Sequence, residues 1–157
     1  MRTLVLPALL LASVAAGSVA SRASDGEVRL VSHDRVEAAF AKGMPLVEVG
    51  DYKIHASRRD GPGGVEIHTR DTDIAYILQG SATLVTGGTP VDVKTVGVDE
   101  FRGSAIRGGE TRELAPGDVV VIPNGVPHWF ERVDAPLLYY VVKVRQAPRA
   151  ESPETPR

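Results

Sequence analysis

The chain has no cysteine among its 157 residues, and this absence excludes several classes of protein. Disulfide frameworks, thiolate zinc sites, iron–sulfur clusters, cysteine nucleophiles and lipid anchors attached through cysteine all require that side chain. Any metal ion must therefore be held by histidine, aspartate or glutamate. An exported protein without cysteine is also indifferent to the redox state outside the cytoplasm.

An excess of positive charge is lacking as well. The sequence holds 18 Lys and Arg against 20 Asp and Glu, for a formal net charge of −2. Proteins that bind a nucleic-acid backbone or an anionic membrane surface usually carry a basic patch, so we expect neither partner. The hydrophobic content of 43% and the charged content of 24% are ordinary for one globular domain.

No apolar run is long enough to span a membrane. After one early cation, Arg2, the run Leu4 to Ala16 has about 13 residues, against roughly 20 needed by a membrane-spanning helix, and Pro7 interrupts it. Small residues follow. We predict a secretory signal peptide over residues 1–20 and hence an exported protein, periplasmic or secreted, with a retained membrane anchor as the alternative.

The remaining chain is expected to form one domain with two flanking segments. We assign residues 21–31 to an N-terminal linker and residues 32–146 to the domain. Residues 147–157, APRAESPETPR, have too little apolar content to pack and are predicted to be a disordered tail.

One helix is predicted, and the rest of the domain is expected to be β-structure. Ser32 can cap a helix over residues 33–42, which has an apolar face and is stopped by Gly43. Gly80 and the pair Gly87-Gly88 are predicted to make tight reversals. The polar, glycine-rich residues 98–110 are predicted to be a long loop. The expected strands are residues 46–49, 51–57, 64–69, 73–79, 81–86, 90–96, 111–115, 118–122, 127–133 and 137–144.

Two stretches carry residues that could bind an ion. Glu66 and His68 are two apart in the strand-like run VEIHT, so both side chains lie on one face, with Cα atoms about 6.6 Å apart. Asp73 opens the next strand-like run, DIAYILQG, and is therefore expected to lie beside the end of the strand that carries Glu66 and His68. Far downstream, PGDVVVIPNGVPHWF places two rigid turns around a strand, with His128 heading the strand that follows.

The downstream stretch resembles the second motif of the cupin superfamily, whose two motifs bracket a small β-barrel with a metal inside. That motif has Gly, five residues, Pro-x-Gly, two residues and His, and it is matched by Gly117, Pro123, Gly125 and His128. The closing Asn of the family falls on Arg132.

The upstream stretch is similar to the first cupin motif, His-x-His, three or four residues, Glu, six residues, Gly. Here it reads Glu66-x-His68, four residues, Asp73, six residues, Gly80. The spacing is kept, while Glu replaces the first His and Asp replaces the Glu. The resemblance covers roughly residues 46–145.

The resemblance implies a cupin-like jelly-roll barrel (a double-stranded β-helix) preceded by one helix, with an open β-sandwich as the alternative. It also implies a divalent metal ion bound by His68, Asp73 and His128, with Glu66 as a fourth ligand. Cupins commonly pair through their outer sheets, so a homodimer is expected.

The residues leave other interpretations open. His68 and His128 could be satisfied interior histidines, and Asp73 could be a turn cap. Glu66 could instead pair with Arg70 or Arg58.

Two imidazoles and two carboxylates would neutralise a divalent ion, whereas three imidazoles and one carboxylate would leave a charge of +1. Carboxylate oxygens favour harder ions, so we rank Mn²⁺, Fe²⁺ and Zn²⁺ above Cu²⁺, with Ni²⁺ possible. Because ligands must be neutral imidazoles, occupancy should weaken as the pH falls through about 6.

We predict a metal-dependent enzyme that acts on a small organic molecule, of oxygenase, isomerase or lyase type. His55, in the run YKIHAS, is a candidate acid or base, or else a half-exposed strand histidine. The alternative is a non-catalytic module that binds or senses a small molecule or the ion. A scaffold with a vestigial site would carry no metal.

Overall fold

The computed structural model describes residues 26–146. The predicted signal peptide, the first part of the predicted linker and the predicted tail lie outside the described residues. No helix in the described part is long and apolar enough to cross a membrane.

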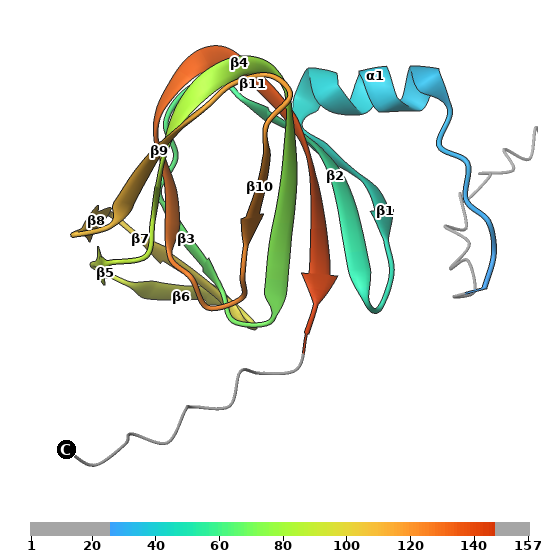
Figure 1. The fold of residues 1–157 in the computed structure, drawn as a ribbon. Helices are drawn as coiled ribbons and strands as arrows, with labels where there is room; N and C mark the ends of the chain where they lie inside the picture. Colours follow the sequence, from blue (N-terminus) through green and yellow to red (C-terminus); the bar gives the residue numbers. More distant parts are fainter. Residues whose placement is uncertain (1–25, 147–157) are drawn as a thin grey trace, which may run out of the picture.

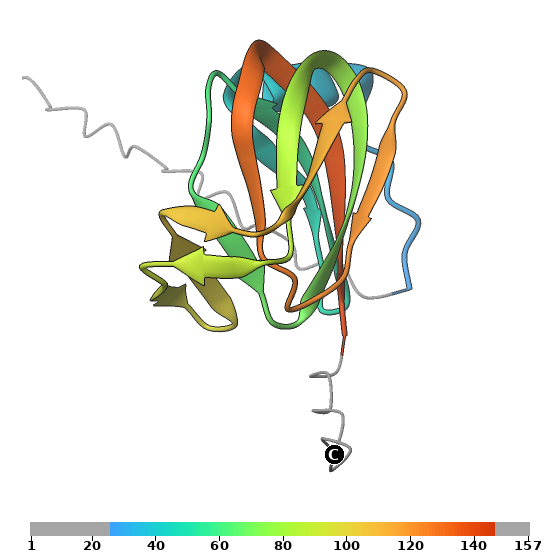
Figure 2. The same ribbon diagram turned by 60° about the vertical axis from the view of Figure 1, so that its left-hand side comes forward.

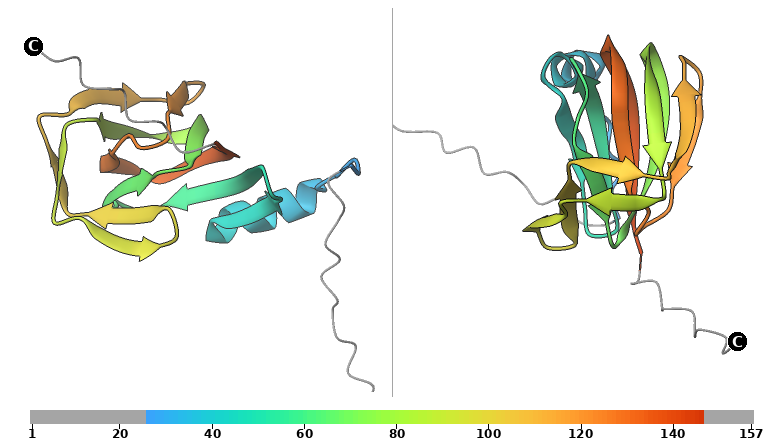
Figure 3. Two further views of the ribbon diagram at one scale, coloured as in Figure 1. Left: turned by 90° about the horizontal axis from the view of Figure 1, so that it is seen from below. Right: turned by 90° about the vertical axis from the view of Figure 1, so that its left-hand side faces the viewer.

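The described chain is one helix followed by strands that curl around a common interior (Figure 1), as predicted for a cupin-like barrel. Seen from below, α1 lies outside this interior (Figure 3). In chain order the elements are α1 (His33–Lys42), β1 (Met44–Glu48), β2 (Tyr52–Arg59), β3 (Val65–His68), β4 (Asp71–Thr86), β5 (Thr89–Val91), β6 (Lys94–Gly97), β7 (Glu100–Gly103), β8 (Ala105–Arg107), β9 (Glu110–Leu114), β10 (Val119–Ile122) and β11 (His128–Arg145).

The helix has the predicted bounds. Gly43 ends it with a φ of 67°, and its N–H bonds to the carbonyl of Ala39. Ser32 is the N-cap residue, as predicted, although its side chain makes no capping hydrogen bond: the first turn is closed by the backbone bond from Val36 N to Ser32 O, at 3.0 Å. Phe40 packs edge-on against Tyr140 of β11, which fixes α1 on the outer face of the sheet.

The two longest strands, β4 and β11, form the frame of the barrel. They pair antiparallel from Asp71 opposite Arg145 to Thr86 opposite His128. Each was predicted as two separate strands. In the structure both strands arch over one end of the barrel, so both ends of each strand reach the opposite end (Figure 1). We call these the bend end and the open end.

Gly80 lies inside β4 at the bend, and the predicted tight reversal there is wrong. Its φ is 78°, and a Cβ atom would stand 2.7 Å from the carbonyl oxygens of Asp134 and Pro136. Glycine is needed because the backbone of β11 passes so close. The strand therefore bends without reversing, and the register of β11 shifts at the same level, between Asp134 and Leu138.

The predicted long loop over residues 98–110 contains two short strands, so that prediction is wrong. β7 pairs with β3, from Val65 opposite Gly103 to His68 opposite Glu100, and β8 pairs with β5. Both short strands form by pairing with strands that are distant in the sequence, and residues 98–110 hold only a few apolar side chains. Figure 2 shows β5 and β8 to one side of the main barrel.

The apolar core fills the bend end. Ile77 and Leu137 flank the bend on β4 and β11, and both are fully buried. The buried members of this cluster are Ala75, Ile77, Ala82, Leu84, Leu114, Ile122, Phe130, Leu137, Tyr139 and Val141. A second, smaller cluster lies under α1 and contains Ala39, Leu46 and Ala56.

Candidate metal centre

The structure brings together the two stretches that carry the motif residues. Glu66 and His68 lie on β3, and His128 opens β11, where it pairs with Glu66. One ligand atom from each of these three residues lies within 4.8 Å of the other two. Both histidines are buried, at 3% and 4% exposure. A cluster of this kind could hold a metal ion.

Hydrogen bonds orient both imidazoles. The Nδ1 atom of His68 is 2.7 Å from a carboxylate oxygen of Glu100, and the Nδ1 atom of His128 is 3.1 Å from the carbonyl oxygen of Val126. Since both partners accept, each Nδ1 donates a proton and each Nε2 keeps a lone pair. Metal-binding histidines are usually held in this way.

Glu66 is bonded to arginine, although not to either of the predicted ones. Arg59 donates from Nη2 to Oε1 of Glu66 at 2.8 Å, and the other carboxylate oxygen lies 3.7 Å from Arg102. Burial pushes the pKa of Glu66 upward. The contact with Nε2 of His68, at 3.5 Å, and the hydrogen bond and charges of the two arginines outweigh this effect and hold the pKa far below its usual range. Glu66 is therefore an anion at neutral pH.

The predicted alternative partners are engaged elsewhere. Arg58 bonds to Asp60, and Arg70 donates to the carbonyl of Gln146.

Asp73 reaches the same centre but has a cationic partner of its own. Its Oδ2 atom is 3.6 Å from Nε2 of His68 and 3.9 Å from Nε2 of His128. Both carboxylate oxygens accept from the Lys143 ammonium, at 2.6 and 2.9 Å. Asp73 lies within β4, where Lys143 is its cross-strand partner, and not in a turn. Asp73 could bind an ion only if its carboxylate released the Lys143 ammonium.

Lys143 also contacts a histidine. Its Nζ atom is 2.9 Å from Nε2 of His68, a distance that requires a lone pair on that nitrogen. The sequence contained a signal for this lysine, because Tyr139, Val141 and Lys143 alternate along β11 and the first two belong to the core.

Glu100 and Arg102 were missed as well, because both lie in the stretch predicted to be a loop.

The pKa values of the two site histidines are shifted in opposite directions. Burial lowers the pKa of His128, and the carbonyl of Val126 only partly opposes this. Burial also pulls the pKa of His68 down, but the protonated ring could donate from Nε2 to Glu66, 3.5 Å away, and this contact together with the charges of Asp73 and Glu100 raises the pKa overall. As the pH falls, His68 is protonated before His128.

His55 lies on β2, opposite Val141 of β11. Its Nε2 atom is buried and has no hydrogen-bond partner among the described residues. Burial lowers its pKa, and the charge of Lys143 lowers it further. His55 is therefore neutral at pH 7 and has a free ring nitrogen.

The start of β11 is tied to the loop before β3. The Trp129 indole donates to the carbonyl of Gly63 at 2.7 Å. Phe130 points inward, where the Arg59 guanidinium lies 4.5 Å from its ring centre. His128 is thus followed directly by two residues whose side chains are anchored.

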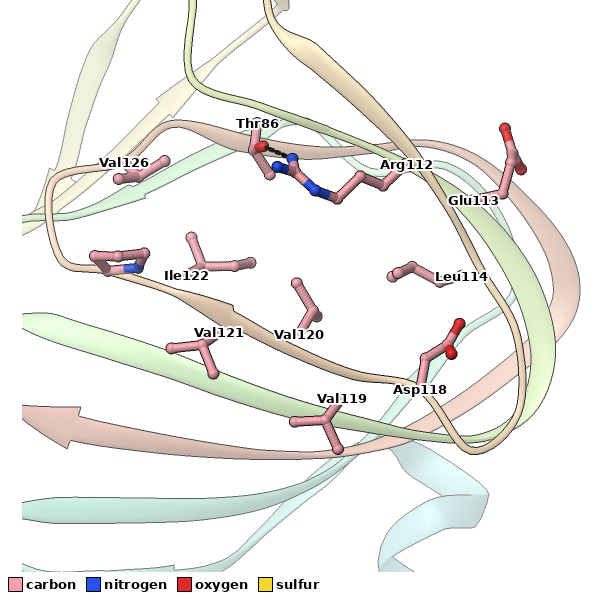
Figure 4. A pocket seen from close by; sticks show the side chains of 11 residues that line it. Thr86, Arg112, Glu113, Leu114, Asp118, Val119, Val120, Val121, Ile122 and Val126 are labelled. Atoms are coloured by element: carbon pink, nitrogen blue, oxygen red, sulfur yellow. Dashed lines mark hydrogen bonds between the residues drawn. The ribbon is translucent and has the colours of Figure 1, made fainter.

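A groove of about 740 Å³ opens between β9 and β10 (Figure 4). These strands pair with different halves of β4, which leaves a space between them. Leu114, Val120 and Ile122 line it, and Arg112 bonds to Thr86 at its rim. None of the four predicted ligands lines the groove, but Val126 does, and its carbonyl orients His128.

Known proteins share this fold. The profile of the family described as Cupin matches residues 35–155. The solved structure of BH2720 from Bacillus halodurans has a TM-score of 0.54 and 15% identity, covering 81% of this chain and 89% of that one. A hydroquinone 1,2-dioxygenase from Sphingomonas sp. TTNP3, solved with 4-hydroxybenzoate bound, has a TM-score of 0.52 and 16% identity, covering 80% and 86%. No curated protein sequence matches the chain.

Proposed function

Since the chain belongs to the cupin family, we propose that it is a metal-dependent enzyme acting on a small organic molecule, with Glu66, His68 and His128 holding the ion. The observation that carries this proposal is the approach of three donor atoms to within 4.8 Å of one another. Both imidazoles present Nε2, and the carboxylate is ionised. Two imidazoles and one carboxylate, with further positions open to water or substrate, are typical of metal sites that carry out chemistry.

The donor set favours Mn²⁺, Fe²⁺ or Zn²⁺, with Ni²⁺ as a further candidate. When bound, such an ion supplies Lewis-acid or oxygen chemistry, as required by an isomerase, a lyase or an oxygenase. A fold neighbour is named as a dioxygenase, which supports oxygen chemistry in a barrel of this shape as one of these candidates.

His55 is the proposed proton acceptor. It is neutral at pH 7, its Nε2 atom is unpartnered, and the charges of Lys143 and Asp73 act on it. A neutral interior imidazole beside a polar centre can take a proton from a substrate. The groove between β9 and β10 is the proposed route by which an organic molecule approaches His128.

A second candidate function is non-catalytic binding or sensing of the ion or of a small molecule. One observation favours it: the Lys143 ammonium already occupies the lone pair of His68 that an ion would need. The protein is therefore electrostatically satisfied without an ion, as a reversible sensor would be.

Elemental analysis of protein isolated from its native compartment tests the site. We expect stoichiometric metal in the wild type and its loss in both His68→Ala and His128→Ala. The matched control is His33→Ala, because His33 is an exposed histidine on α1. The ligand assignment is wrong if both site variants keep wild-type metal content.

Mass spectrometry distinguishes the two functions. Metal-loaded protein is incubated with a small-molecule extract, and consumption of any component is followed. An enzyme consumes a component in a way that His55→Gln abolishes while its metal content stays normal. Binding without consumption, in either protein, supports the sensing function.

Export and homodimer formation are further proposals. The outer face of β10 and β4 carries exposed apolar side chains, including Val119, Val121 and Tyr76, which a second copy would cover. The mass of the secreted chain tests removal of residues 1–20, and sedimentation tests the dimer.

A further inference from the structure

The charges around the candidate metal centre are already balanced without an ion. Three carboxylates, Glu66, Asp73 and Glu100, form a network with three cations. The cations are Arg59, Arg102 and Lys143. Every carboxylate is within 3.5 Å of a cation. The two imidazoles are neutral when they act as ligands.

A divalent ion would leave two positive charges in excess in this network. Excess charge in a partly buried site is costly unless an anion enters with it. The balance therefore points to an anionic ligand that binds together with the metal.

Lys143 is placed to hold that anion. Its ammonium bonds to Asp73 and to the lone pair of His68, and a metal ion on His68 must take that lone pair for itself. The ammonium then keeps Asp73 and has a donor free beside the ion. Its side chain is 15% exposed, so water screens it only in part.

The surroundings favour an organic anion. On the strands that carry Lys143 and Asp73, the next residues on the same face toward the bend are Val141 and Ala75, and both are buried and apolar. A ligand whose charged end lies between the ion and Lys143 would thus place its carbon skeleton against apolar side chains.

We infer that the metal-loaded centre binds a small organic carboxylate, and that Lys143 is the residue that selects its negative charge. This inference rests on the proposed function, because it requires a metal at Glu66, His68 and His128. It names the class of substrate that the enzyme takes.

Calorimetric titration with Mn²⁺ tests the inference on the metal-free protein, in excess acetate or in excess acetamide at equal ionic strength. The two small molecules differ in charge and hardly in shape. We expect acetate to tighten Mn²⁺ binding about tenfold relative to acetamide, a typical coupling between two sites. In Lys143→Met the acetate effect should vanish, while Mn²⁺ binding in acetamide becomes tighter because a competing cation is gone.

Lys53→Met is the matched control. Lys53 is the cross-strand neighbour of Lys143 on β2 and pairs with Glu48, so its loss changes the net charge equally without touching His68 or Asp73. This variant should keep the acetate effect. If Lys143→Met does not fold, Lys143→Met with Asp73→Asn removes both charges of the pair and serves in its place.

The outcomes separate the two proposals. If the wild type binds no Mn²⁺ under either condition, the proposed function and this inference both fail. If Mn²⁺ binds equally in acetate and acetamide, the proposed function stands and the inference fails. An acetate effect that persists without Lys143 also overturns the inference.

Discussion

The bend end and the open end of the barrel are built from the same two strands, yet they are held together by different forces. Near the bend, β4 and β11 contribute Ile77 and Leu137, which are fully buried and apolar. At the open end the same strands contribute Asp73 and Lys143, which bond to each other. Stability is concentrated at one end, and the other end is free to carry chemistry.

The energies explain this division. Burying a leucine or isoleucine side chain stabilises a fold by about 1.5–3 kcal/mol. A buried ion pair contributes little net stability, because desolvation offsets the attraction. The polar network at the open end therefore adds little to stability, and its pairs can be exchanged only where an incoming ion supplies a new partner for each charge.

The largest expected effect comes from the bend end. Leu137→Ala should lower the free energy of unfolding by about 2–5 kcal/mol, because it leaves a cavity in a fully buried position. Urea unfolding of the metal-free protein measures this. Leu138→Ala is the control, since Leu138 is only partly buried. The division between a stabilising bend end and a functional open end is contradicted if Leu137→Ala loses metal binding while keeping wild-type stability.

Gly80→Ala tests the bend itself. A positive φ costs a non-glycine residue roughly 1–3 kcal/mol, and here the new Cβ would also stand 2.7 Å from two carbonyl oxygens. Gly87→Ala is the matched control, because Gly87 has a φ of 71° but nothing within 4 Å of its Cβ position. Thermal unfolding should show a larger loss for Gly80→Ala. Equal losses of thermal stability in the two variants would mean that the close approach of β11 to Gly80 adds nothing to the cost of the substitution.

The smallest effect belongs to the open end and depends on pH. The raised pKa of His68 means that protons compete with the metal from a higher pH than for an ordinary histidine, above the value of about 6 expected from the sequence. Below that pKa, apparent affinity should fall about tenfold per pH unit. Glu100→Gln should shift the decline to lower pH, because Glu100 helps to raise the pKa. Mn²⁺ titrations across pH measure both, and an unchanged profile would contradict the role of Glu100.

The sequence predicts the elements whose signals are local. Helix α1 follows from its apolar face and Gly43, and the proximity of Glu66 and His68 follows from the strand period. That His128 lies beside these two residues was implied only by the resemblance to cupins, because no local rule relates residues 60 positions apart.

What the sequence could not predict depends on distant pairing. Glu100 orients His68 only because β7 pairs with β3. Lys143 is recognisable as an inward residue from its alternation with Val141, but its contact with Asp73 depends on the register of β4 and β11. Gly80 shows the same limit, since a positive φ is compatible with a turn or with a close strand crossing.

The indole of Trp129 gives the molecule a built-in optical probe. It is the single tryptophan of the chain, it directly follows His128, and its N–H is fixed on the Gly63 carbonyl. Its fluorescence therefore originates from one known position beside the imidazole. A paramagnetic ion held there would quench that emission, so loading and release could be followed in real time without any attached dye.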